Sequence, residues 1–93
     1  MSITRINTFQ AAEGKNEQLF DFLFNLIPYI SNSTGNTSCE VLRQSGDNCR
    51  FVVIEKWESA EAHQQSIAAY PKEKMQAAMA LFGAPPVGTT YHS

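Results

Sequence analysis

The residues best suited to chemistry lie where an apolar segment ends at Trp57 and a helical segment bearing His63 begins. Imidazole has an ordinary pKa of about 6.5, which suits proton transfer near neutral pH. An indole supplies a large apolar surface together with one N–H donor. If the protein has a pocket, we expect its wall here.

Asn7 is the second candidate. In an extended segment its side chain shares one face with Arg5 and with the hydrophobic residues Ile3 and Phe9. One interpretation is an amide tied to a neighbouring backbone group. The other is an amide that projects into a mostly apolar cavity, where a few polar groups fix the orientation of a ligand.

The elements that must position these groups are a strand and the helix that follows it. Residues 51–54, Phe-Val-Val-Ile, are apolar at consecutive positions, whereas a strand with one exposed face alternates. This pattern predicts a strand over 50–57 that is buried on both faces. Ser59 is suited to cap the next helix, 60–68, and Glu61 in its first turn favours the helix dipole.

The two cysteines can be tested against a metal site and a disulfide. They flank residues 45–48, which are typical of a hairpin turn. With Gln44 opposite Cys49, Cys39 would face Ile54, so the cysteines would lie about 17 Å apart along the strands. A disulfide needs Cα atoms within about 7 Å. The pattern therefore predicts two reduced thiols, and no zinc site, iron–sulfur cluster or other metal site.

Composition limits the remaining possibilities. The chain has 93 residues, 43% hydrophobic and 11% aromatic, which predicts one globular domain over residues 1–93. A net charge of −2 gives no electrostatic basis for binding nucleic acid or an anionic membrane. No apolar run approaches the roughly 20 residues that span a bilayer. The first residues, MSITRINTF, lack the apolar region of a signal peptide, so we expect a cytoplasmic protein.

Other segments complete the predicted fold. Asn16 is a candidate cap for a helix over 17–31, whose apolar residues cover more than half of its circumference. Part of that surface should therefore face a cavity or a second subunit. The further expected elements are strands over 2–10, 37–44 and 87–92 and a helix over 71–82.

The order of elements is β-α-β-β-α-β, with the second helix broken in two. This order predicts an α+β, ferredoxin-like fold, in which an antiparallel sheet carries its helices on one face. The other face is usually exposed to water, yet residues 51–54 are apolar on both sides. A second copy of the chain, packed sheet against sheet, would cover it, and we expect a homodimer.

The segment RFVVIEKWESAEAH, the turn at Gly14-Lys15 and the loop before Cys39 resemble the antibiotic biosynthesis monooxygenase family. The resemblance extends from about Ile3 to Tyr91. It implies a dimeric α/β barrel built from two ferredoxin-like sheets. The family includes cofactor-independent oxygenases of polycyclic phenols and quinols, haem-degrading enzymes and a signal-molecule isomerase.

The resemblance also implies roles for particular residues. Asn7 and His63 would be catalytic, with no cofactor, and the substrate would be a small hydroxylated aromatic, a quinol or a polyketide-type molecule that reacts with dioxygen. The protein would exclude water, accept a proton and stabilise the resulting anion. The residues expected to contact the substrate are Trp57, Tyr70, Phe20 and Phe24.

The sequence departs from the family pattern at several positions. Many relatives carry histidines where this chain has Ser66 and, near the start of the last helix, Pro71. The haem-degrading branch combines an Asn in the first strand with a Trp and a His on later helices, where Gln65 and Met75 stand here. These differences disfavour haem degradation.

Structural explanations also remain for the candidate residues. Trp57 could anchor the core or the dimer interface, and His63 could lie on the exposed side of its helix. Two alternatives to the oxygenase therefore stay open: a non-catalytic dimeric module that binds a small ligand, and an isomerase of the same superfamily.

Overall fold

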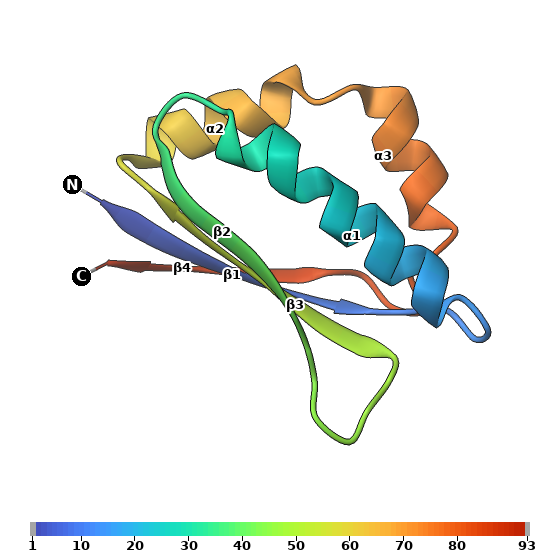
Figure 1. Cartoon of the computed structure of the whole chain (residues 1–93). Coiled ribbons are helices and arrows are strands. Elements are labelled where there is room, and N and C mark those ends of the chain that lie inside the picture. The colour runs from blue at the N-terminus through green and yellow to red at the C-terminus, as the bar shows by residue number, and fades with distance from the viewer. Residues whose placement is uncertain (1, 93) are drawn as a thin grey trace.

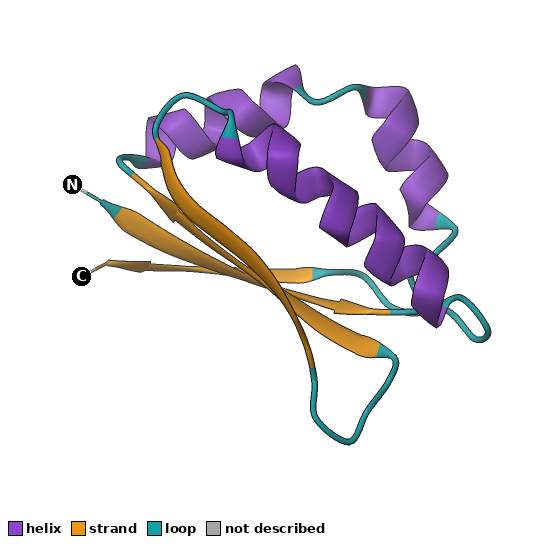
Figure 2. Ribbon diagram, in the orientation of Figure 1, coloured by secondary structure: helices purple, strands orange, loops and turns teal. Residues whose placement is uncertain are grey.

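The computed structural model describes residues 2–92. The chain folds into four strands and three helices in the order β-α-β-β-α-α-β (Figures 1 and 2). The elements are β1 (Ile3–Gln10), α1 (Asn16–Ser31), β2 (Asn36–Arg43), β3 (Arg50–Trp57), α2 (Ala60–Ala69), α3 (Lys72–Met79) and β4 (Val87–His92). This order confirms the predicted ferredoxin-like α+β fold.

The strands form one antiparallel sheet in the order β2-β3-β1-β4. All three helices lie on the same side of the sheet (Figure 1). α1 runs across the sheet, and α2 and α3 lie beside α1. β1 and β3 are therefore the central strands, and their helix-facing side chains meet the interior. Among residues 2–92, no helix is long and apolar enough to cross a membrane.

The two faces of β3 are buried to different extents. Its helix-facing residues, Phe51, Val53, Glu55 and Trp57, are all buried. Val52 and Ile54 point to the opposite face and are only half-buried in the single chain. Within the single chain, β3 is therefore fully buried only on the face that meets the helices. Burial of its other face by a second chain stays a prediction.

The hairpin between β2 and β3 differs from its predicted register by one residue. Cys39 pairs with Glu55, not with Ile54. Asp47 is the cause, because its amide N–H bonds to the carbonyl of Gln44 at 3.3 Å and its carboxylate accepts from the Cys49 amide at 3.0 Å. This local turn lengthens the connection by one residue. A one-residue shift moves each side chain to the other face, so Cys39 points toward the helices.

The helix ends follow the predictions in part. The hydroxyl of Ser59 accepts a hydrogen bond from the Ala62 amide at 3.1 Å, which confirms this cap of α2. Asn16 is wrong as a cap, because it is already helical and the preceding residue, Lys15, makes no side-chain cap bond. α3 ends at Met79, earlier than expected, where the chain turns toward an isolated bridge between Ala11 and Phe82.

The buried hydrophobic residues form two clusters under α1. The larger cluster includes residues of the first half of β3 and comprises Ala11, Leu19, Leu23, Phe51 and Val53. The smaller one lies at the end of β3 and comprises Ile3, Ile30 and Trp57. Leu26 on α1 contacts both clusters. The interior is therefore well packed under α1, and the space beneath α2 and the start of α3 is where a cavity can form.

Candidate functional site

A cavity of about 470 Å³ lies between the helix-facing side of β1 and β3 and the three helices. Most of its wall is apolar, from residues such as Leu26, Ile30, Ile67 and Met75. Its volume and apolar lining are typical of sites for small organic ligands. Arg5, Asn7 and Glu55 on the strands and His63 on α2 form one polar wall, and the tyrosines, Ser66 and Lys72 add polar groups elsewhere in a lining that is otherwise apolar.

A chain of hydrogen bonds crosses the strand side of this cavity. Arg5 Nη2 donates to Asn7 Oδ1 at 3.1 Å, and Asn7 Nδ2 donates to Glu55 Oε2 at 3.0 Å. Trp57 Nε1 donates to Glu55 Oε1 at 2.9 Å. These partners define which end of the Asn7 amide is which, because a guanidinium only donates and a carboxylate accepts. Asn7 therefore lines the cavity, as the second interpretation expects, and its amide bonds to the side chains of Arg5 and Glu55, not to a backbone group.

Glu55 is the centre of that network. The residue is 7% exposed, and each carboxylate oxygen accepts one N–H from a neutral side chain. Burial raises the pKa of Glu55 above its ordinary value, while the Trp57 hydrogen bond and the Arg5 charge oppose that rise. Burial, together with the charges of Glu55 and Glu40, also raises the pKa of the Cys39 thiol to about 11.

Arg5 is the cation of the wall. It lies directly opposite Glu55 in the β1–β3 register, and its Nη1 donates to Thr90 Oγ1 at 2.9 Å. Its Nε is buried and has no hydrogen-bond partner, the single buried side-chain nitrogen or oxygen of residues 2–92 in that condition. Leaving a buried donor unpaired costs about 1–3 kcal/mol, so such groups are uncommon.

His63 closes the cavity from α2 and is half-buried. Its ring meets the Trp57 indole edge-on, with 5.5 Å between the ring centroids. Burial lowers the pKa of His63 below its ordinary value, and the nearby Arg5 charge lowers it further. The imidazole is therefore neutral at neutral pH and can accept a proton. The sequence-based alternative that places His63 on the exposed side of its helix does not describe this position.

Two tyrosines form the other end of the cavity. Tyr29 on α1 donates its hydroxyl hydrogen to the Ser66 carbonyl at 2.7 Å. Tyr70, which caps the end of α2, packs its ring edge-on against Tyr29 with 5.1 Å between the centroids. Ser66 lines the cavity, and its hydroxyl shares a hydrogen bond of 2.9 Å with that of Ser33. Tyr70 therefore contributes an aromatic surface.

The structure brings together four of the six residues expected at the site. Asn7, Trp57, His63 and Tyr70 all line the cavity. Phe20 and Phe24 do not line it: their rings stack on each other with 5.9 Å between centroids, and Phe24 is 57% exposed. The guanidinium of Arg43 lies over the Phe20 ring at 3.9 Å. α1 thus turns these two phenylalanines toward the β2 side of the sheet and turns Leu26 and Tyr29 toward the cavity.

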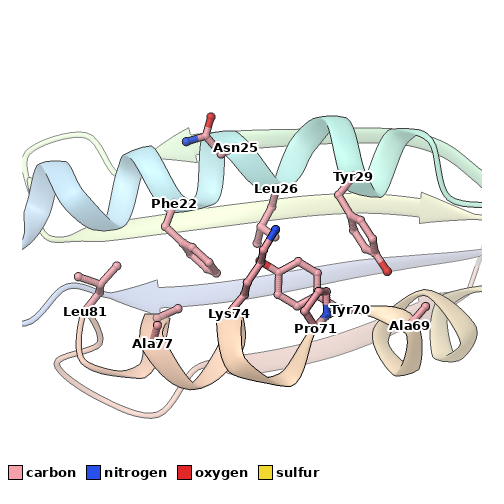
Figure 3. A pocket seen from close by; sticks show the side chains of 11 residues that line it. Phe22, Asn25, Leu26, Tyr29, Ala69, Tyr70, Pro71, Lys74, Ala77 and Leu81 are labelled. Atoms are coloured by element: carbon pink, nitrogen blue, oxygen red, sulfur yellow. The ribbon is translucent and has the colours of Figure 1, made fainter.

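A second cavity, of about 670 Å³, lies between α1 and α3 (Figure 3). Phe22, Leu26 and Tyr29 line it from α1, and Lys74, Ala77 and Leu81 line it from the opposite side (Figure 3). Leu26, Tyr29 and Tyr70 belong to the walls of both cavities. The tyrosine pair therefore stands between a chamber against the sheet and a groove between the helices.

Glu55 is the site residue that sequence analysis missed. A signal was present, because Glu55 shares its face of β3 with Phe51, Val53 and Trp57, and a carboxyl on such a face must be buried with partners. The apolar residues at 51–54 predicted a buried strand, but that pattern did not include Glu55, the polar residue that follows them. Arg5 was placed on the correct face, without a role.

The described residues offer little as metal ligands. Between Ser2 and His92, no group of three or more His, Cys, Asp or Glu side chains is placed to hold a metal ion. Cys39 and Cys49 are both free thiols, and no disulfide joins them, as expected.

Three solved structures are similar to this chain in fold. A variant of SnoaB, a cofactor-independent oxygenase from Streptomyces nogalater, has a TM-score of 0.85 at 16% identity, over 99% of this chain and 92% of that chain. A putative antibiotic biosynthesis monooxygenase from Nitrosomonas europaea has a TM-score of 0.90 at 16% identity, over 99% and 89%. A protein from Shewanella oneidensis has a TM-score of 0.89 at 24% identity, over 99% and 90%.

The sequence comparisons agree with this likeness. No curated protein matches the chain at a significant level. The family model described as antibiotic biosynthesis monooxygenase matches residues 2–80, which include the first three strands and every residue of the hydrogen-bonded network except Thr90. The chain belongs to the antibiotic biosynthesis monooxygenase family.

Proposed function

We propose that this protein is a cofactor-independent monooxygenase of a hydroxylated aromatic or quinol, of the size and shape of a small polyketide. The observation that carries the proposal is the wall of the 470 Å³ cavity, where the Arg5–Asn7–Glu55–Trp57 network and His63 face an otherwise apolar space. Family membership supports the reaction type. The similarity to the oxygenase SnoaB supports the fold on which such a reaction runs.

The first step is proton removal. A phenol, enol or anthrone bound in the cavity loses a proton to His63, whose lowered pKa keeps the imidazole neutral and able to accept it. Asn7 has both of its amide atoms engaged by Arg5 and Glu55, which holds its second N–H in a fixed direction as a donor to the substrate. Trp57 uses its N–H on Glu55 and therefore presents its ring.

The second step is electron transfer from the substrate anion to dioxygen, followed by formation of a carbon–oxygen bond. For an anthrone, the new carbon–oxygen bond gives a peroxide on the CH₂ carbon. The O–O bond of this peroxide then breaks, and the carbon becomes a carbonyl. One oxygen atom stays on carbon, and the other leaves as water with the two hydrogens. All four electrons come from the substrate, so the balance needs an electron-rich aromatic and no external reductant. The apolar wall excludes water from the anion.

We also propose that the protein forms a homodimer through the outer face of its sheet. Support comes from apolar side chains on that face that the single chain leaves open, among them Leu42 and Tyr91, which are 45% and 50% exposed. Val52 and Ile54 continue this surface on the central strand. Contiguous exposed apolar surface of this kind marks an interaction site, and two like sheets related by a two-fold axis bury it in both copies. The free thiols accord with the cytoplasmic location expected from the sequence.

The test of the reaction is oxygen uptake without added cofactor, using metal-depleted protein and a panel of anthrones, quinols and catechols. We expect uptake that depends on the protein and that falls in the Trp57→Phe and His63→Gln variants. Phe is preferred to Ala at position 57, because Trp57 is 1% exposed and its truncation would open the core. His92→Gln is the matched control, since His92 is exposed at the end of β4. Uptake that is equal in wild type and His63→Gln would contradict the assigned proton acceptor.

A second function is favoured by one observation. The family resemblance implies a histidine at the position of Ser66, whose hydroxyl here is engaged by Ser33, and among the described residues His63 is the single imidazole on the cavity wall. A protein with this wall could bind its ligand without oxidising it. Thermal stabilisation by panel compounds with no oxygen uptake would support a dimeric binding module.

A further inference from the structure

The Arg5 guanidinium on the cavity wall has only neutral hydrogen-bond partners. It donates to the Thr90 hydroxyl and to the side-chain amide oxygen of Asn7, and its Nε–H has no acceptor. The ion pairs of the chain between Ser2 and His92 are Arg43–Glu17 and Arg50–Asp47, and neither includes Arg5. A half-buried cation therefore lines a mostly apolar cavity without a carboxylate in direct contact with it.

Glu55 lies nearest in sequence register and still does not neutralise Arg5 by direct contact. The two residues are opposite each other on β1 and β3. Both carboxylate oxygens of Glu55, however, accept from Trp57 and Asn7. The Asn7 amide stands between the cation and the carboxylate and bonds to both. The positive charge of Arg5 is thus held in place and left available to the cavity.

The neighbouring strand makes room for this arrangement. Gly88 on β4 lies opposite Asn7, and a Cβ atom at that position would collide with the Arg5 guanidinium and come within 2.7 Å of Asn7 Oδ1. Any side chain larger than hydrogen would push Arg5 away from Asn7. The absence of a side chain at position 88 is therefore what allows the guanidinium to lie against β4 beside Asn7 and the cavity.

We propose that Arg5 is the anion-binding residue of the cavity, and that the ligand it takes is a phenol or enol bound as its oxyanion. This inference rests on the proposed function, whose first intermediate is such an anion. A guanidinium next to the forming oxyanion stabilises it in a water-poor site, where electrostatic interactions are stronger than in water. Arg5 thereby complements His63: one holds the negative charge, and the other takes the proton.

The other groups that face this position do not compete for the role. His63 on α2 is neutral near pH 7, and Glu55 on β3 is occupied. Tyr29 donates its hydroxyl hydrogen to Ser66, and Tyr70 packs at the far end of the cavity. Lys72 at the start of α3 is the second cation of the lining, but it is exposed to water, which screens its charge.

A phenolate fits better than a carboxylate. A carboxylate is held best by two parallel N–H donors of a guanidinium, and here one hydrogen of each terminal nitrogen is already given to Thr90 or Asn7, so fewer parallel pairs of donors remain among its five N–H groups. A single charged oxygen on an aromatic ring needs fewer donors and places its ring in the apolar part of the cavity. The ligand class is therefore an aromatic alcohol that ionises easily, such as an acyl-substituted phenol or an anthrone in its enol form.

The test is an absorbance titration of a chromogenic phenol bound to the protein, with 4-nitrophenol and 4-nitro-1-naphthol as probes. The phenolate forms of these probes are coloured, so the pH midpoint of the bound probe measures how well the site stabilises the anion. We expect the wild-type protein to lower that midpoint relative to free probe. Arg5→Gln should raise the pH midpoint of the bound probe, because the ionisation constant of the probe should fall about tenfold or more without the guanidinium. Arg5→Lys should restore part of the wild-type effect.

Two variants serve as controls. Arg43→Gln removes an arginine that lies over Phe20 outside the cavity, and it should leave the midpoint unchanged. Lys72→Gln removes the exposed cation and should have the smaller effect. Thermal unfolding of each variant checks that the fold is intact, and competition by 4-nitrobenzoate compares a carboxylate with the phenolate.

The results that overturn the inference are specific. A bound midpoint that is equal in wild type and Arg5→Gln, a larger effect of Lys72→Gln, or tighter binding of 4-nitrobenzoate than of the phenolates would each contradict it. Absence of saturable binding of both probes would contradict a phenolate site as well. The titration involves no oxygen, so a normal midpoint shift without oxygen uptake would retain the anion site and reject the oxygenase.

Discussion

The Trp57 indole nitrogen donates a hydrogen bond of 2.9 Å to Glu55, two residues earlier on the same face of β3. This bond lies at the bottom of the cavity and links the largest buried side chain to the one buried carboxyl of the described chain. It explains why an acidic residue is tolerated on a strand face that is otherwise apolar. It also fixes the ring that His63 packs against.

The first prediction concerns the pH dependence of stability. Burial raises the pKa of Glu55 in the folded state, so the folded chain holds this proton more tightly than the unfolded chain does. The contribution is fully present below the ordinary Glu pKa, about 4.3, and is lost as the pH rises through the folded pKa. Glu55→Gln cannot ionise. The stability of this variant relative to wild type should therefore increase as the pH rises from about 4, measured by urea unfolding.

The same variant has an expected cost at every pH. A Gln side chain offers one oxygen and one NH₂ group to two N–H donors, from Trp57 and Asn7, so one hydrogen bond is lost. A difference in stability between the two proteins that stays constant from about pH 4 to pH 8 would show that Glu55 does not titrate in this window.

The second prediction concerns the pH dependence of turnover. Burial and the Arg5 charge lower the pKa of His63, so the imidazole stays neutral somewhat below its ordinary pKa of about 6.5. Turnover in the proposed oxygenase reaction should hold to below that pH and then fall as His63 takes a proton. His63→Gln should reduce turnover by about 100-fold and remove this acid limb. Initial-rate oxygen uptake across pH measures this acid limb. An acid limb that is unchanged in His63→Gln would assign the titration to another group.

The third prediction concerns the outer face of the sheet. Leu42→Lys places a charge on the face that we propose as the dimer interface, and static light scattering should show a shift toward monomer. Met79→Lys is the matched control, because Met79 is an exposed apolar residue on α3, away from that face. Wild-type protein that is monomeric at micromolar concentration, or equal dissociation of both variants, would count against the proposed interface.

The fourth prediction compares the two tyrosines of the cavity. Tyr29→Phe removes the hydroxyl that bonds to the Ser66 carbonyl and leaves that acceptor half-buried, so the free energy of unfolding should fall by about 1 kcal/mol. Tyr70→Phe keeps the edge-on ring contact and should cost clearly less. Denaturant unfolding of both variants measures the difference. Equal losses of unfolding free energy would mean that the hydrogen bond of the Tyr29 hydroxyl contributes no more to stability than the Tyr70 hydroxyl does.

The fifth prediction tests the space left by Gly88. Gly88→Ala should displace the Arg5 guanidinium, because the new Cβ would meet it and Asn7 Oδ1. Binding of the chromogenic phenols should weaken about tenfold, while the sheet persists. Thr89→Ala is the neighbouring control on the opposite face of β4. If both variants bind the probes as wild type does, Arg5 is not held in place by this contact.

Much of the fold could be predicted from the sequence, because its signals are local. β3 and β4 have the bounds expected from their strand patterns, and Ser59 caps α2 as its position before a helical segment predicts. The register of the β2–β3 hairpin could not be predicted. It depends on side-chain bonds of Asp47 to the chain around Cys49, and a hairpin count that considers only turn length does not include them.

The site was predictable in part for a similar reason. Asn7, Trp57 and His63 each carry a local signal, and the sheet register brings them to one cavity. Phe20 and Phe24 carry an equally apolar signal, but α1 is apolar over so much of its surface that its pattern does not fix its rotation. Glu55 required knowledge of which β3 face is interior, and that is a property of the assembled sheet.

The register that turns Cys39 toward Glu55 also has a consequence for oxidative damage. Peroxide and other reduced oxygen species attack the thiolate form of cysteine, not the thiol. With a pKa of about 11, Cys39 is protonated throughout the physiological range. Asp47 accepts a hydrogen bond from the Cys49 thiol and raises its pKa too. Both sulfur atoms are therefore kept in their least reactive form, which would suit the reaction with dioxygen proposed for this chain.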